Sequence, residues 1–162
     1  MCLNTKRHKE NAIRIILIAL NISVAVLIFI LSSQPAEISG PLSEGVIYRI
    51  LDLLTGLSEE KLIIISSSLN GIARKLAHFS VYALLSVLMN LLLLRYNIKY
   101  SKGMIISFAL CFLYAVSDEI HQYFVPGRSC EFRDVMIDSC GILSGIIIIC
   151  LIKLIKSKLR KV

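Results

Sequence analysis

The residues with the greatest chemical capability stand together between Ser117 and Arg128. This stretch holds two adjacent carboxylates, an imidazole, an amide and a guanidinium: Asp118, Glu119, His121, Gln122 and Arg128. It directly follows an apolar run, Met104 to Val116, that contains no charged residue. Such groups can exchange protons, bind a divalent cation or contact phosphate and carboxylate groups. No G-x-S-x-G, H-E-x-x-H or phosphate-loop motif is present, so the spacing does not decide between binding and catalysis.

The composition indicates a membrane protein. The 162 residues are 56% hydrophobic and only 18% charged, with a mean hydropathy of +0.77, whereas about a quarter of a soluble domain is charged. The net charge of +7 is not gathered into a basic patch interleaved with aromatic residues, so we expect no nucleic-acid partner. The five cysteines show no C-x-x-C and no zinc spacing, and we expect no cofactor and no resident metal.

Four apolar segments come close to the roughly 20 residues that a spanning helix needs. They lie at about 13–31, 72–94, 104–124 and 134–155. In the outer segment 32–71, Gly40-Pro41 and Asn70-Gly71 predict helix breaks, and Glu44 to Leu57 has the pattern of an amphipathic helix at the interface. We therefore expect an all-α integral membrane protein with one domain (1–162), four transmembrane helices and one or two short interfacial helices on the outer side.

The charges outside the spans predict the orientation. The N-terminal segment, the Arg95–Lys102 link and the C-terminal tail together hold 12 of the 18 lysines and arginines, but only one of the 11 acidic residues. Positive charge accumulates on the cytoplasmic side of membrane proteins. This rule predicts that both termini are cytoplasmic and that the 32–71 segment and the link after the third span face the exterior.

Polar residues share one face of each of the last three spans. At helical spacing these faces carry Lys75, His78, Tyr82 and Ser86 in the second span, Ser107, Cys111, Tyr114, Asp118 and Gln122 in the third, and Asp134, Asp138, Gly141 and Gly145 in the fourth. Because charge inside a bilayer is costly, such faces turn inward. We expect them to converge on a cavity that opens to the outer side. The Gly141–Gly145 pair also permits close helix approach, including that of a second copy in a homo-oligomer.

Several of these residues also have purely structural explanations. Glu119 lies off the face of Asp118 and Gln122, so it could simply be hydrated among the lipid headgroups, and His121 fits a structural role. Arg74 fits a side chain that snorkels to the interface. Asp134 could cap the fourth span, whereas Asp138, one turn deeper, is not explained by capping alone.

Three segments resemble the VanZ-like membrane proteins. Ser32-Ser33-Gln34-Pro35 is similar to the family's S-S-Q-P segment, and Lys75 to Tyr82 resembles its K-x-x-H-F-x-x-Y pattern. Asp118 to Arg128, followed by Asp134, resembles its D-E-x-x-Q-x-F-x-P-G-R…D-x-x-x-N-x-x-G signature, with Asp138 where Asn is most common. The resemblance implies a bacterial multi-pass cell-membrane protein. The family's namesake confers low-level teicoplanin resistance, although most members sit outside resistance clusters.

The leading hypothesis is recognition of a polar, anionic group that is either lipid-linked and envelope-derived or glycopeptide-type, by a protein embedded in the lipid bilayer. Lys75 and Arg128 would contact the anion, while Asp118, Asp134 and His78 would orient it or the basic pair. The remaining expected ligand-binding residues are Tyr82, Glu119, Gln122 and Asp138.

Two alternatives remain open from the residues. A membrane-embedded hydrolase or transferase acting on a lipid-linked envelope substrate would use His78 or Glu119 as a general base, with a metal held by Asp118, Asp134 and His121. A third hypothesis is a small transporter or an assembly partner. Transport by the monomer is favoured least, because only Asn21 and Asn90 place strongly polar side chains near the middle of a span.

Overall fold

The computed structural model describes residues 2–96 and 98–160, with side chains from Arg7 onward. Five helices account for nearly all of this part of the chain, which contains no strand: α1 (Cys2–Ser32), α2 (Ala36–Thr55), α3 (Glu59–Arg95), α4 (Tyr100–Tyr123) and α5 (Phe132–Leu159). Helices α1, α3, α4 and α5 are each long and apolar enough to cross a membrane. The prediction of an all-α chain with four such helices is confirmed.

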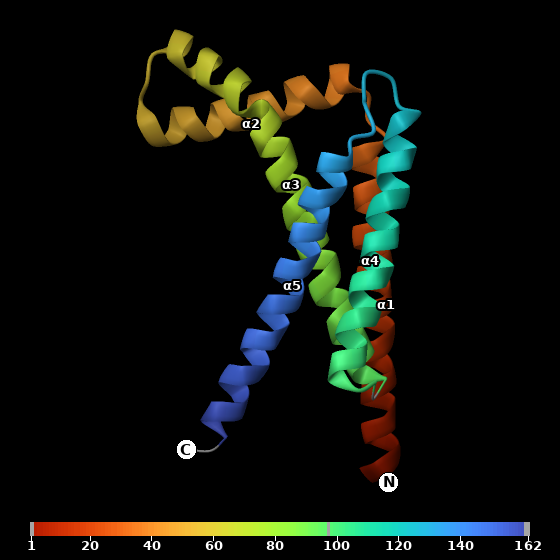
Figure 1. Cartoon of the computed structure of the whole chain (residues 1–162). Coiled ribbons are helices and arrows are strands. Elements are labelled where there is room, and N and C mark those ends of the chain that lie inside the picture. The colour runs from red at the N-terminus through yellow and green to blue at the C-terminus, as the bar shows by residue number, and fades with distance from the viewer. Residues whose placement is uncertain (1, 97, 161–162) are drawn as a thin grey trace.

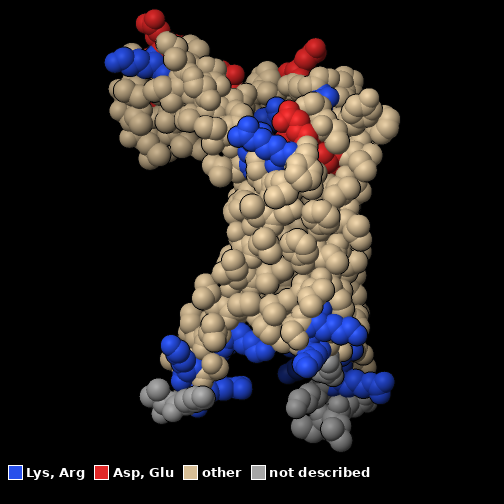
Figure 2. Space-filling view, viewed as in Figure 1, with Lys and Arg blue, Asp and Glu red and all other residues tan. Residues whose placement is uncertain are grey.

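Helix α3 is the centre of the arrangement. It packs on each of the other four helices, and its largest contact is with α5 (Figure 1). Both termini lie at the same end of the molecule, and α2 lies across the opposite end (Figure 1). Lysines and arginines gather at the end with the termini, while the acidic side chains visible in this view lie at the end with α2 (Figure 2).

Helices α3 and α5 approach closely because α5 carries glycine where the two cross. A Cβ atom on Gly141 would collide with the carbonyl group of Phe79, and one on Gly145 would collide with that of Ala83. The small-xxx-small pattern is therefore used inside the chain. Both glycines are buried against α3.

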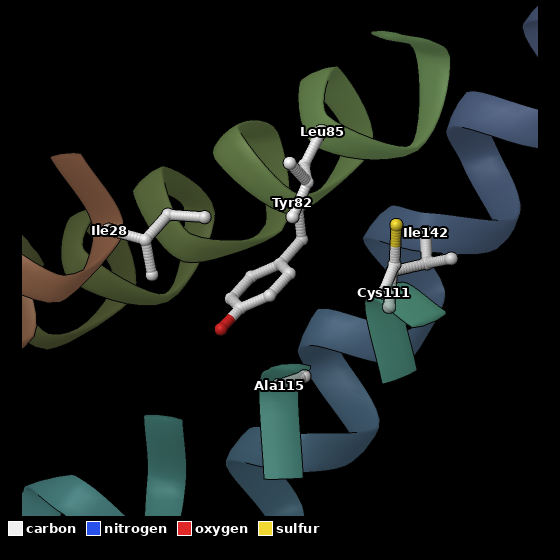
Figure 3. Close-up of a cluster of buried hydrophobic side chains, with 6 residues drawn as sticks. All are labelled: Ile28, Tyr82, Leu85, Cys111, Ala115 and Ile142. Carbon is white, nitrogen blue, oxygen red and sulfur yellow. The ribbon is translucent and has the colours of Figure 1, made fainter. Parts of the chain in front are cut away.

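The buried apolar core is small and draws on all four long helices. Ile28 of α1, Tyr82 and Leu85 of α3, Cys111 and Ala115 of α4 and Ile142 of α5 form one cluster (Figure 3). Most other large apolar side chains are exposed along the helices. This distribution is typical of helices whose surroundings are lipid tails, where close packing rather than the hydrophobic effect joins the helices.

Two predicted helix breaks are wrong. Helix α2 continues through Gly40-Pro41, and α3 continues through Asn70-Gly71. The Asn70 side chain is used to fasten one helix to the other. Its Nδ2 donates to the Gly40 carbonyl (3.1 Å), and its Oδ1 accepts a hydrogen bond from Ser43 Oγ (2.5 Å). A tertiary contact thus overrides the local breaking tendency of Asn-Gly.

The expected second short helix is instead the first part of α3. The 37 residues of α3 span about 55 Å at 1.5 Å per residue, whereas the apolar core of a bilayer is about 30 Å thick. Its N-terminal part and α2 therefore form a hairpin, residues 36–71, joined at Ser43 and Asn70. No residue of α2 is buried, and Ile38, Leu42, Val46, Ile50 and Leu53 form an exposed apolar stripe on it.

Candidate functional site

The link between α4 and α5 begins with the predicted turn. The Arg128 amide donates to the Val125 carbonyl (3.1 Å), and Gly127 has a φ of 73°, as the third position of a type II turn requires. A Cβ on Gly127 would lie 3.0 Å from the Cβ of Ala36, and the Ala36 amide donates to the Pro126 carbonyl (3.3 Å). The turn is therefore seated against the start of α2.

Arg128 ties this turn to the end of α1. Its guanidinium donates to the carbonyl groups of Gln34 (3.0 Å) and Leu31 (3.2 Å), to Gln122 Oε1 (3.1 Å) and to Ser39 Oγ (3.2 Å). A cation at a helix C-terminus also interacts favourably with the helix dipole. Burial lowers the pKa of Arg128 from its usual value, which is so high that the group stays charged. The expected anion-binding residue is thus largely engaged in joining α1, α2 and α4.

Asp118 also contacts the end of α1, close to the residues that Arg128 joins. Its Oδ2 accepts hydrogen bonds from Ser32 Oγ (2.8 Å) and Gln122 Nε2 (3.1 Å), and the residue is only 4% exposed. Its Oδ1 is buried without a hydrogen-bond partner among the described residues, as is the hydroxyl of Tyr82. Ser32, the first residue of the S-S-Q-P segment, was missed as a site residue, although the motif itself pointed to it.

Glu119 is not a surface residue, contrary to one of our expectations. It is 2% exposed, and its Oε1 accepts the backbone N–H of Glu131 (2.7 Å), the residue that precedes α5. A carboxylate placed there caps the helix from outside it. His121 has the structural role that was proposed for it, because its Nε2 lies 3.0 Å from Ser33 Oγ and its ring stacks on Phe29.

A cavity of about 210 Å³ opens between α3, α5 and the link that precedes α5. Its walls hold charged groups of both signs, and acidic and basic side chains meet at this end of the molecule (Figure 2). Seven of the nine expected ligand-binding residues line it: Lys75, His78, Glu119, Gln122, Arg128, Asp134 and Asp138. The other two, Tyr82 and Asp118, are buried behind its walls.

Two pairs of side chains connect α3 with α5 across the cavity. Lys75 Nζ lies 2.8 Å from Asp134 Oδ1, and both side chains are about a third exposed. One turn deeper, His78 Nδ1 lies 3.9 Å from Asp138 Oδ1, and the Asp138 side chain is 2% exposed. Asp134 is inside the first turn of α5 and does not cap it, since Glu131 occupies the cap position. The predicted inward faces of α3 and α5 are confirmed.

Arg74 is a cavity residue that the sequence reasoning assigned to the interface. It is partly buried and lines the cavity next to Lys75. No ion pair to Arg74 occurs within the described part of the chain. The sequence could have indicated this role, because Arg74 directly precedes Lys75 and two consecutive residues of a helix can line the same cavity from its two sides.

The three metal ligands expected under the enzyme hypothesis, Asp118, Asp134 and His121, do not come together in the structure. Among the described residues no group of three His, Cys, Asp or Glu side chains is placed to hold a metal ion. His121 in particular is paired with Ser33, which is not among the cavity-lining residues. What the cavity offers is two basic side chains near its mouth, a histidine, and carboxylates with little contact to water. This arrangement can bind a small charged group or assist a proton transfer.

The comparisons with known proteins agree with the sequence motifs. The family model for VanZ/LLP1 matches residues 17–153, which include every residue that lines the cavity. A search of the curated proteins gave no match, and neither did a search of the solved structures. With most of its length matched by the family model and four helices able to cross a membrane, the chain belongs to the VanZ/LLP1 family and is a VanZ-like membrane protein.

Proposed function

We propose that the cavity binds the small polar headgroup of an envelope lipid at the boundary of the membrane. The observation that carries this proposal is a charged cavity placed where four apolar helices reach their common end. Its volume of about 210 Å³ is below the range of roughly 300–1,000 Å³ that is typical for drug-sized ligands. A headgroup is therefore a better fit than an entire glycopeptide.

Arg74 and Lys75 are the proposed contacts for the anionic part of the headgroup. Arg74 has no ion-pair partner among the described residues, and Lys75 shares Asp134 while remaining 37% exposed. Hydrogen bonds between such cations and phosphate or carboxylate are about twice as strong as neutral ones. Arg128 supports the site by holding the turn and Gln122 in place.

We further propose that the protein resides in the bacterial cell membrane with both termini cytoplasmic, so that the cavity faces outward. The segregated basic residues support this orientation, and the exposed apolar stripe of α2 suits a helix lying along the outer interface. In a variant whose only cysteine is Cys130, which is exposed on the α4–α5 link, an impermeant thiol reagent should label intact cells. A matched variant with its only cysteine from Ser157→Cys, near the end of α5, should react only after lysis. The reverse pattern would invert the orientation.

A contribution to glycopeptide resistance would, on this proposal, arise from the envelope lipid that the protein binds. The antibiotic itself is too large for the cavity. Expression of the protein should then alter teicoplanin susceptibility only when the cavity is intact, and Arg74→Gln should abolish any such effect.

The binding proposal is tested on the whole chain in mild detergent. Titration calorimetry with soluble glycerophosphodiester headgroups should detect binding to the unaltered chain. Arg74→Gln should weaken that binding at least 10-fold, since a hydrogen bond between charged groups contributes about 1.5–3 kcal/mol. Arg133→Gln is the matched control, because Arg133 is exposed and does not line the cavity. Equal losses in the two variants, or no binding by the unaltered chain, would contradict the proposal.

A membrane-embedded hydrolase or transferase is the second candidate. The pair formed by His78 and the buried Asp138 favours it, since a carboxylate beside an imidazole can orient a general base. Incubation of the protein with isolated envelope lipids, followed by mass spectrometry, should reveal a product that His78→Gln fails to form. Unchanged lipid in both samples would leave binding as the function.

A further inference from the structure

The cavity is lined by charges of both signs, and only some of them are paired. Arg74 and Lys75 stand on the part of α3 nearer the outer end, whereas His78 and Asp138 are deeper, with 3.9 Å between Nδ1 and Oδ1. Arg74 precedes His78 by four residues, which is about 6 Å along a helix. Asp134 and Glu131 line the outer part of the cavity as well, and Asp134 pairs with Lys75, which leaves Arg74 without an ion-pair partner among the described residues.

Two buried carboxylates that line the cavity lack a basic partner. Asp138 and Glu119 are each 2% exposed, and neither lies within ion-pair distance of a lysine or arginine in the described part of the chain. Asp138 has His78 at 3.9 Å, and Glu119 accepts one backbone N–H. A carboxylate with so little water is stabilised by a nearby cation, and a purely anionic ligand reaching these carboxylates would be repelled.

We infer that the ligand is zwitterionic, with a phosphate or carboxylate held by Arg74 and Lys75 and an ammonium group directed toward Asp138 and Glu119. This inference rests on the proposed headgroup-binding function and adds the chemical class of the headgroup. A phosphodiester joined to an ammonium group through two carbons carries both charges on one short group. It also has the small size that the cavity volume requires.

The test compares two soluble probes that differ only at the far end. Glycerophosphoethanolamine carries an ammonium group, and glycerophosphoglycerol carries hydroxyl groups there. Titration calorimetry should show the first probe binding at least 10-fold more tightly than the second. Asp138→Asn, which preserves the size of the side chain, should reduce the first affinity to the level of the second, whereas Arg74→Gln should weaken both. Asp52→Asn, on the exposed surface of α2, is the control and should change neither.

The outcomes separate this inference from the function on which it rests. Equal affinities for the two probes, with Arg74→Gln still weakening both, would overturn the zwitterion and leave headgroup binding intact. Binding of neither probe would overturn both proposals. Circular dichroism of each variant should match that of the unaltered chain, which separates a loss of binding from a loss of folding.

A second measurement identifies the source of the headgroup. The protein is placed in nanodiscs with equal phosphatidylethanolamine and phosphatidylglycerol, extracted with detergent, and its retained lipid is identified by mass spectrometry. Enrichment of phosphatidylethanolamine would support a lipid as the carrier of the zwitterion. No enrichment, combined with tight binding of glycerophosphoethanolamine, would support a free zwitterion. Enrichment of phosphatidylglycerol would overturn the inference.

Discussion

Two layers of buried polar residues lie at different depths between the helices, and they are built differently. The serine–asparagine layer consists of Ser86 and Asn90 of α3 and Ser107 of α4, all at most 3% exposed. The cavity layer, nearer the α2 end of the molecule, consists of the half-buried His78 and of the buried Asp118, Glu119, Gln122 and Asp138. Both layers interrupt an apolar interior, where unsatisfied polar groups are costly.

The serine–asparagine layer is neutral and closed. Asn90 Nδ2 donates to the Ser86 carbonyl and to Ser107 Oγ, both at 2.8 Å, and Ser86 Oγ donates to the Ile142 carbonyl (2.9 Å). These bonds link α3 with α4 and α5. Such a network sets the register of packed helices and leaves nothing for a ligand to contact.

The cavity layer is charged and incomplete. Asp118 Oδ1 has no partner among the described residues, Asp138 has only a distant histidine, and a cavity of about 210 Å³ adjoins the layer. Ionisable groups inside a membrane protein persist where they face a cavity or a functional partner. The difference between the layers teaches that polarity alone does not mark a site here. A functional site is marked here by charged side chains that lack an ion-pair or hydrogen-bond partner and lie beside the cavity.

The largest expected effect comes from Gly141→Val, which should disrupt both layers. The added side chain would collide with the backbone of Phe79, and because backbone cannot move aside as a flexible side chain does, we expect a loss of 3 kcal/mol or more, at about the upper limit of overpacking costs. Thermal unfolding in detergent measures it. Gly45→Ala is the matched control, since its new Cβ meets no atom and should stabilise α2 by about 0.5–1 kcal/mol. Equal thermal stability of the two variants would contradict the α3–α5 packing.

Arg128→Lys should have the next largest effect, on the cavity layer alone. Lysine keeps the charge but cannot reach the Leu31 and Gln34 carbonyls and Gln122 Oε1 together. We expect about 2–3 kcal/mol of lost stability, measured by denaturant titration in detergent. Arg133→Lys serves as the comparison, because Arg133 is exposed and should tolerate the change. If both variants unfold at the same denaturant concentration, the hydrogen bonds of Arg128 to the end of α1 and to Gln122 do not stabilise the fold.

Asn90→Ala and Asp138→Asn should separate the two layers most directly. Asn90→Ala removes the partner of Ser107 and should cost about 1–3 kcal/mol, with headgroup binding unchanged. Asp138→Asn should leave stability equal or higher while binding of a zwitterionic headgroup falls at least 10-fold. Thermal unfolding and titration calorimetry on the same samples give both quantities. A binding loss in Asn90→Ala at full folding would erase the functional distinction between the layers.

The smallest effect is expected for the pair at the cavity mouth. Lys75→Met and Asp134→Asn, alone and combined, form a double-mutant cycle for an ion pair whose members are 37% and 35% exposed. Water screens such a pair, so the coupling in stability should be below about 1 kcal/mol. The single Lys75→Met variant should still weaken anion binding. A coupling of several kcal/mol would show that this pair, and not the deeper layer, organises the helices.

Local pattern predicted much of this molecule. Four apolar segments and the 3.6-residue spacing of their polar side chains predicted four long helices and the inward faces that carry His78, Asp118 and Asp138. These inferences succeed because the apolar length that a bilayer requires and the cost of exposing charge to lipid are properties of each segment by itself. The Val125–Arg128 turn was predictable for a similar reason, since only glycine readily adopts the positive φ there.

Contacts between distant segments decided the rest. Asn70 fastens α2 instead of ending a helix, Arg128 holds backbone carbonyl groups of α1 more than it awaits an anion, and Glu119 caps α5 instead of facing water. Each outcome depends on a partner 12 to 97 residues away in the chain. A long polar side chain forms hydrogen bonds with whichever group the fold brings within reach. The residues next to it in the sequence do not predict which group that is. The sequence by itself determined which faces turn inward, and the tertiary structure alone decided which of their charges are left free beside a cavity.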